Sequence, residues 1–195
     1  MSDHGGSYTS RRLVLKDWGS EEEVFEFAAE GRFELIRDES EDIPLGIVRD
    51  VLWWITPTIA LQYAVDTRSQ CSVFALTGTP ADDVKGIVES IEQGVHPWTL
   101  KELLAAVNDA RGPAEVAAAV LRAGMGAPQS FDRKFYKVVR TAIRSHDAEV
   151  RSAGVWATSY SRWDKSRDLL ETTAEADPEP SIRRDARVIL EHYDS

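Results

Sequence analysis

Hydrophobic and polar residues follow two different periods along the chain, and the change falls near residue 97. Before it, apolar residues recur at every second position in several short runs, which is the period of a β-strand. The run 32–38 (RFELIRD) predicts a strand with one solvated face, and 11–16 (RRLVLK) predicts a shorter strand. Residues 59–78 hold two alternating runs separated by the polar DTRSQ, which predicts a hairpin.

Two segments of this first part carry the signals of helix ends. Residues 20–31 begin with Ser20 and have Glu23 three positions later, which is the capping-box spacing, and we expect the helix to end at Gly31.

The second helix is expected over residues 79–94. Thr79 is its predicted N-cap, Pro80 stands at the first helical position, and Gly94 is the predicted end.

The run 47–56 (IVRDVLWWIT) fits both periods. Ile47, Val51 and Trp54 have helical spacing, whereas the β-branched and aromatic content favours a strand, and we expect a helix. With the other elements, this predicts a small α+β domain over residues 11–95, in which helices cover one face of a mostly antiparallel sheet.

The termini of this domain follow from composition. Residues 1–10 are rich in Gly and Ser and predict a flexible N-terminal arm. The boundary on the other side is expected between His96 and Trp98, so that residues 96–195 form the second domain.

Beyond the boundary every segment has helical periodicity, and short connections favour antiparallel neighbours. The six predicted helices are 99–110, 113–124, 132–145, 147–160, 165–176 and 180–193.

A short pattern recurs within these helices. The pair Val150–Arg151 returns as Ile182–Arg183 after 32 residues, and a fainter copy, Val116–Ala117, stands 34 residues before the first. A period of this size with two helices in each copy is typical of a solenoid, here of about three helix pairs.

The recurring residues resemble those of the HEAT-repeat family. The third copy has Asp177 and Pro178 in the turn, followed by Ile182, Arg183 and Ala186.

The second copy has Asp147, Val150, Arg151 and Gly154, with the turn shortened by two residues, and the first copy has Ala117 where the family has Arg. The resemblance covers residues 99–195 and implies an α-helical HEAT-like solenoid, in which the recurring Arg pairs with an acid such as Asp147 or Asp177.

Charge and composition limit the classes of molecule that the protein is expected to bind. The formal net charge is −10, and residues 1–130 hold 11 Lys and Arg against 21 Asp and Glu. Such an acidic body repels phosphates, so nucleic acid is an unfavourable partner and a protein with a basic face a favourable one. The single Cys71 excludes an intramolecular disulfide, and no apolar run is long enough for a signal peptide or a membrane span, so we expect a cytoplasmic protein without membrane contact.

The search for chemistry finds no catalytic constellation, no metal-ligand spacing among the four His residues and no cofactor motif. Aromatic and Arg side chains near the second and third copies could line a binding groove, or Trp156 could be core and the charges a solvated face. The candidates are Arg151, Trp156, Tyr160, Trp163, Arg183, Arg184 and Arg187.

These features favour a non-enzymatic module for protein–protein interaction, such as an adaptor, a regulatory subunit or an immunity-type inhibitor. The alternative is a HEAT-like DNA glycosylase acting on alkylated bases, by resemblance to compact HEAT-like enzymes of that kind. In it Trp156 and Trp163 would hold the base, and Asp164 would stabilise the developing cation.

Overall fold

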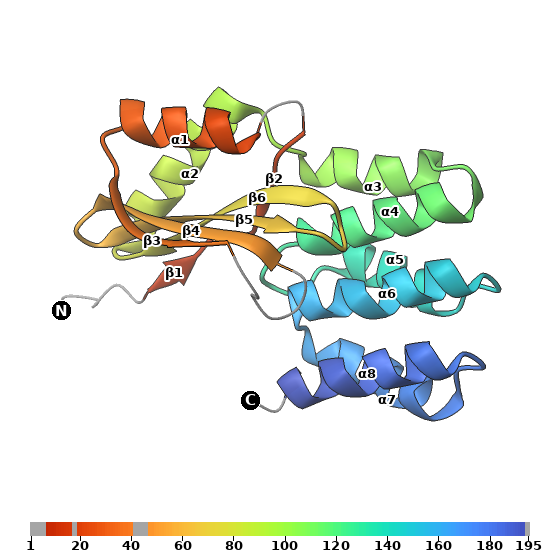
Figure 1. The fold of residues 1–195 in the computed structure, drawn as a ribbon. Coiled ribbons are helices and arrows are strands. Elements are labelled where there is room, and N and C mark those ends of the chain that lie inside the picture. The colour runs from red at the N-terminus through yellow and green to blue at the C-terminus, as the bar shows by residue number, and fades with distance from the viewer. Residues whose placement is uncertain (1–6, 17–18, 41–46, 194–195) are drawn as a thin grey trace. The chain divides into compact units, whose positions relative to one another are not determined.

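The computed structural model describes residues 7–16, 19–40 and 47–193, and the chain divides into two compact units, Met1–Trp98 and Thr99–Ser195. The first unit is a sheet with helices and the second is entirely helical among its described residues (Figure 1). Each unit has a hydrophobic core of its own. The fold is therefore α+β with a helical C-terminal part.

The sheet of the first unit is antiparallel at every pairing, in the order β1-β6-β5-β4-β3, with β2 pairing with β6 as well. The strands are β1 (Tyr8–Thr9), β2 (Leu13–Val14), β3 (Glu34–Glu39), β4 (Ile47–Thr56), β5 (Ile59–Asp66) and β6 (Cys71–Gly78). The predicted hairpin is confirmed as β5–β6, where Asp66 lies opposite Cys71.

Helices α1 (Glu21–Glu30) and α2 (Ala81–Val95) cover one face of this sheet, as the alternation predicted (Figure 1). Apolar side chains from both helices pack against the inward positions of the strands. They are Val24, Ala28, Val84, Ile91 and Val95 against Val51, Trp53, Leu61, Tyr63, Phe74 and Leu76. The capping box of α1 is present as predicted, with the Ser20 hydroxyl accepting from the Glu23 N–H.

The helix expected over residues 47–56 is wrong, because this run is strand β4 between β3 and β5. Burial alternates along it: Val51 and Trp53 face the core, whereas Trp54 is 38% exposed. A two-residue connection to β5 closes a second hairpin. Pairing with β3 and β5 gives hydrogen-bond partners to backbone N–H and C=O groups that a helix would pair within itself.

Two other predictions for the sheet differ from the structure. Strand β3, at one edge of the sheet, is exposed at every position, so it does not have the one buried face that its alternation predicted. Of the predicted arm, residues 1–6 lie outside the described residues, and Tyr8–Thr9 pairs with β6.

The ends of α2 also differ from the prediction. Its N-cap is Pro80 and not Thr79, and no side chain caps it. The helix continues past Gly94 to Val95, and His96 ends it in the left-handed conformation.

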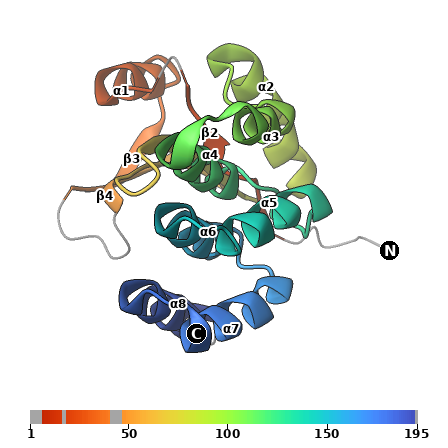
Figure 2. The same cartoon turned by 90° about the vertical axis from the view of Figure 1, so that its right-hand side faces the viewer.

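All six predicted helices of the second unit are present, each end within two residues of its predicted position. They are α3 (Leu100–Asp109), α4 (Gly112–Met125), α5 (Arg133–Ile143), α6 (Ala148–Ser161), α7 (Arg167–Ala176) and α8 (Pro180–Tyr193), with a short 3-10 helix at Asp164–Ser166. Consecutive helices form three pairs, and α4, α6 and α8 follow one another in one row while α3, α5 and α7 form the other (Figure 2).

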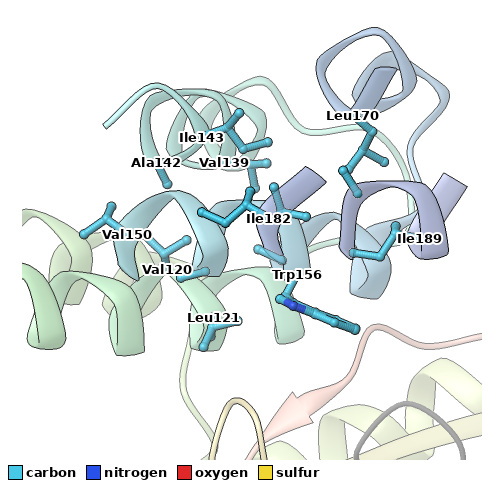
Figure 3. Packing of buried hydrophobic residues seen from close by; sticks show 14 of the residues in the cluster. Val120, Leu121, Val139, Ala142, Ile143, Val150, Trp156, Leu170, Ile182 and Ile189 are labelled. Carbon is cyan, nitrogen blue, oxygen red and sulfur yellow. The ribbon is translucent and has the colours of Figure 1, made fainter. Parts of the chain in front are cut away.

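The core of the second unit lies between these two rows and draws on α4 to α8 (Figure 3). The apolar stripe of α8 points into it through Ile182, Ala186 and Ile189. The row α4–α6 is closely packed, because a Cβ added at Gly124 would lie 2.6 Å from the Cβ of Ala157.

The exposed side chains of the third pair are mostly polar. They include Asp168, Glu171, Thr172, Glu175, Ser181, Arg184, Arg187 and Glu191. No helix among the described residues is long and apolar enough to cross a membrane.

Candidate functional site

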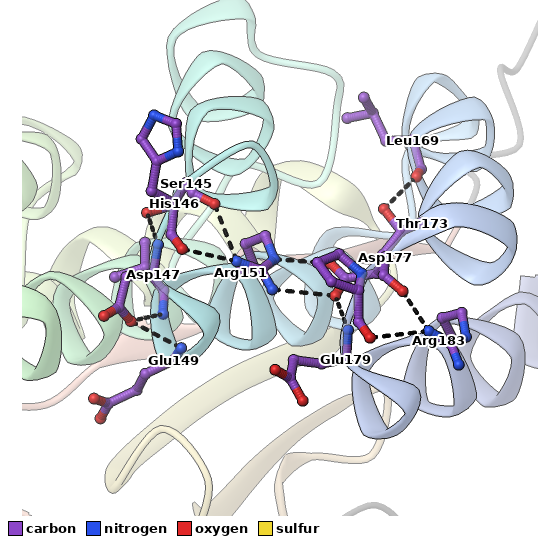
Figure 4. Close-up of polar contacts among 12 residues, drawn as sticks. Ser145, His146, Asp147, Glu149, Arg151, Leu169, Thr173, Asp177, Glu179 and Arg183 are labelled. Carbon is purple, nitrogen blue, oxygen red and sulfur yellow. Dashed lines mark hydrogen bonds and ion pairs between the residues drawn. The ribbon is translucent and has the colours of Figure 1, made fainter.

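Arg151 of α6 joins the second helix pair to the third. Its Nε donates to Asp177 Oδ2 at 2.8 Å and its Nη2 to Asp177 Oδ1 at 3.2 Å (Figure 4). Its Nη1 donates to the carbonyls of Ser145 and His146, at 3.3 and 3.1 Å. The guanidinium is buried, so the predicted pairing of this Arg with an acid of the turn is confirmed, with Asp177 as that acid.

Arg183, one copy later, repeats the bonds that Arg151 makes to the carbonyls of its own turn. Its Nη1 donates to the carbonyls of Asp177 and Pro178, which stand six and five residues before it, as Ser145 and His146 stand before Arg151.

These bonds set the register between copies and correct one equivalence. Ser145, not Asp147, occupies the place that Asp177 has in the third copy, so the turn is not shortened by two residues. Asp147 instead caps α6, because its Oδ1 accepts from the N–H groups of Glu149 and Val150.

The first copy lacks the bridge altogether. Burial along α4 matches burial along α6 at an offset of 34 residues, which places Ala117 at the position of Arg151. Ser145 stands at the place of the acid Asp177. Between the first two pairs, both the Arg and the Asp of the bridge are therefore replaced by residues without charge.

The aromatic candidates are mainly core. Trp156 is buried, and its indole N–H donates to Asp185 Oδ2 at 2.9 Å. Trp163 is buried, donates to the Gln129 carbonyl at 3.2 Å and packs edge-on against a Phe ring. Tyr160 is half-buried against the core.

The remaining candidates lie on α8. Arg184 is exposed, with its Nε 4.0 Å from Asp185 Oδ1, and Arg187 is exposed while donating to the Ala174 carbonyl at 2.8 Å. The buried members of the predicted set thus hold helices together, whereas Arg184 and Arg187 are surface residues.

A pocket that the sequence analysis missed opens between α3, α4, α5 and α6. It has a volume of about 630 Å³. Its apolar wall is formed by Leu104, Val107, Val116, Val120, Val138, Ala142 and Val150. Its polar lining is formed by Asn108, Lys134, Lys137, Thr141, Arg144, Ser145 and His146. Among the described residues, no carboxylate contributes to the lining.

The basic part of this lining belongs to a strongly basic helix. Residues 131–146 hold five Lys and Arg against one Asp, in a protein with a net charge of −10. All five cations are exposed, and within the described part of the chain none of them forms an ion pair with a carboxylate. This local excess is visible in the sequence, but a count over residues 131–195 conceals it, because that region is balanced overall.

The pKa values of both partners in the Arg151–Asp177 bridge are shifted, that of Arg151 upwards and that of Asp177 downwards. Burial alone would raise the pKa of the Asp177 carboxyl, but hydrogen bonds from the Arg151 guanidinium and the Glu179 N–H outweigh burial and hold this pKa below its ordinary value. The bridge is thus charged on both sides at neutral pH, which suits a fixed structural link.

Within the described residues, no three His, Cys, Asp or Glu side chains come together in a way that could hold a metal ion. Comparison of the chain with models of protein families, with curated proteins and with solved structures gives no match. A function therefore has to follow from the chain's own residues.

Proposed function

We propose that this chain is a non-enzymatic protein-binding module whose helical unit is a short HEAT-like solenoid of three helix pairs. Binding a partner protein through this unit would make it an adaptor, a regulatory subunit or an inhibitor. Such a role fits a cytoplasmic protein.

The HEAT-like assignment is supported by the repetition of one local arrangement. Arg151 and Arg183 donate to turn carbonyls at the same two separations, five and six residues back. The helices also follow one another in two rows, α3, α5, α7 and α4, α6, α8, which is how stacked pairs bury a shared core (Figure 2).

The pocket between the first two pairs is the observation that carries the binding role. An apolar wall surrounded by polar and charged groups is the anatomy of a recognition surface, and a volume of about 630 Å³ lies in the range of ligand-binding clefts. An ordinary structural void would have no reason to gather exposed cations at its rim.

The charge of the chain is divided between its two units. Residues 1–98 hold 8 Lys and Arg against 18 Asp and Glu, whereas residues 99–195 hold 15 of each. The partner with a basic face, expected from the net charge, would therefore meet the first unit, while the helical unit offers a basic patch of its own.

Site-specific crosslinking tests the binding role. A photoreactive amino acid is placed at Thr141, which is exposed and lines the pocket, or at Glu171, which is exposed on α7 and does not. After irradiation in native lysate we expect one protein to crosslink from position 141 and not from position 171.

Absence of a crosslinked protein at position 141 would overturn the proposal. The glycosylase alternative has its own assay, release of alkylated bases from damaged DNA, and Asp164→Asn would abolish it. Because Trp156 and Trp163 are buried with their indole N–H groups bonded, we expect no such release.

A further inference from the structure

We infer that the pocket between α3, α4, α5 and α6 binds an acidic, amphipathic peptide segment of the partner protein, with apolar side chains on the pocket wall and carboxylates on the rim. This inference rests on the proposed protein-binding function and names the chemistry of the segment that the partner inserts.

The pocket has two chemically distinct parts. Leu104, Val107, Val116 and Val120 come from the first helix pair and face the apolar residues of α5 and α6, so the wall accepts aliphatic or aromatic side chains. The rim on the α5 side is cationic. A ligand that satisfies both parts must carry apolar and anionic groups together.

Three cations form a row along α5 and its C-cap. Lys134, Lys137 and Arg144 follow at intervals of three and seven residues, which keeps them on one helix face, with the neutral Thr141 between the last two. The row from Lys134 to Arg144 is about 15 Å long at 1.5 Å per residue.

The length of this row decides between two kinds of occupant. A fatty acid has one carboxylate and would neutralise one end of the row. A peptide with several Asp or Glu residues can place carboxylates along all of it, so the charge distribution favours a peptide.

The opening exists where the Arg–Asp bridge is missing. Between the second and third pairs, Arg151 and Asp177 occupy the junction at the turns. Between the first and second pairs the equivalent residues are Ala117 and Ser145, and the shorter side chains leave room beside Val116 and Val150. The pocket thus lies at the junction that lacks the bridge.

The test is a selection of random 12-residue peptides, displayed on phage, against the full chain. Two charge-reversed variants serve as probes: Lys134→Glu with Lys137→Glu on the rim, and Arg133→Glu with Arg140→Glu on the same helix away from the lining. Both variants change the charge equally, and all four residues are exposed, so circular dichroism and the melting temperature should match those of the parent chain.

We expect the selected peptides to be enriched in Asp, Glu and large apolar residues. Their affinity should fall about tenfold in the rim variant, through loss of two charge pairs, and less than about threefold in the control variant. Filling the wall with Val138→Trp should also weaken binding, without changing the charge.

Other outcomes overturn the inference. They are the absence of selected peptides, the selection of basic or uncharged peptides, and an equal loss of affinity in both charge variants. Binding of dodecanoate that is lost in the rim variant, without peptide selection, would assign the pocket to a small aliphatic acid. A dimer of the chain that dissociates in the rim variant would assign it to a second copy.

The two proposals fail separately. A protein crosslinked at Thr141 together with selected peptides that are not acidic would retain the binding role and reject the acidic segment. No crosslinked protein at Thr141 would reject the binding role itself.

Discussion

At the scale of single residues, the second unit is held by one buried ion pair whose partners come from different helix pairs. Arg151 and Asp177 are 26 residues apart in sequence, and both are buried. Each of the three nitrogens of the Arg151 head group donates to an acceptor, either a carboxylate oxygen or a turn carbonyl. A buried charge of this kind stabilises the fold only while its partner is present.

Removing one partner should therefore be costly, and removing both should cost less than the two single removals added together. We expect Arg151→Met to lower the free energy of unfolding by about 3–5 kcal/mol, because it leaves the Asp177 carboxylate buried without its guanidinium. The double variant with Asp177→Leu should lose about 2 kcal/mol less than the sum of the single variants. Urea denaturation of all four proteins measures this, with the exposed Arg184→Met as control, and additive losses would contradict it.

The same pair predicts a dependence on pH. The pKa of Asp177 is lower in the folded protein than its ordinary value, so the unfolded chain takes up a proton first as the pH falls. The contribution of Asp177 to the free energy of unfolding is complete above about pH 4, which is the ordinary pKa of an Asp in an unfolded chain. This contribution is lost as the pH falls through the lower pKa that Asp177 has in the folded protein.

Asp177→Asn removes this titration. The difference in the free energy of unfolding between wild type and this variant should thus be largest near pH 7 and shrink towards pH 2. Denaturation curves at both pH values give the two differences, and a constant difference would contradict the role of Asp177.

At the scale of elements, close packing of helices depends on small residues. At Gly124 an added Cβ would lie 2.6 Å from the Ala157 Cβ and 2.9 Å from its Cα, so backbone as well as side chain would have to move. In α2, by contrast, nothing lies within 4 Å of a Cβ added at Gly86.

This contrast predicts opposite effects of one substitution. Gly124→Ala should lower the free energy of unfolding by about 1–3 kcal/mol through overpacking of α4 against α6. Gly86→Ala should raise it by about 0.5–1 kcal/mol, because Ala is the better helix former and meets no neighbour. Thermal denaturation of both variants is sufficient, and a stabilised Gly124→Ala would show that α4 and α6 are not tightly packed.

Elements were predictable where one period was unambiguous. The helices of the second unit have long stripes of period 3.6 and clear caps, such as Thr99 and Asp132, and their ends were predicted within two residues. The run 47–56 was predicted wrongly because its apolar residues fit both the helical and the strand period. Pairing with β3 and β5 makes it a strand. Such pairing is a tertiary effect that local spacing does not contain.

The candidate site was predicted less well than the fold. The recurring Arg and the resemblance to HEAT repeats predicted that Arg151 pairs with Asp147 or Asp177, and Asp177 is the partner. The sequence pattern did not show that Trp156 and Trp163 are buried, since a tryptophan serves a core and a groove equally well in sequence. The pocket is lined by residues of four helices, and local spacing in the sequence does not show which helices lie next to one another.

At the scale of the whole molecule, two cores without shared residues predict two independent folding units. The core of the first unit uses residues up to Val95, and that of the second starts at Ala117. Each core belongs to one side of the division at Trp98.

We expect a fragment of residues 99–195 to fold without the first unit. Its far-UV circular dichroism should be that of a helical protein, and it should melt cooperatively, because its apolar stripes are buried within the fragment. Sedimentation at equal concentration would confirm that it is not an aggregate. A fragment that melts without a cooperative transition would contradict the division.

The polar exposed side of the third helix pair has a consequence for self-assembly. Units built of stacked pairs can polymerise end to end when the last pair offers an apolar side, since the next molecule then continues the pile. Here contact with another molecule at the third pair would have to strip water from Glu171, Glu175 and Arg184. The cost of dehydrating those charges opposes end-to-end growth through this surface.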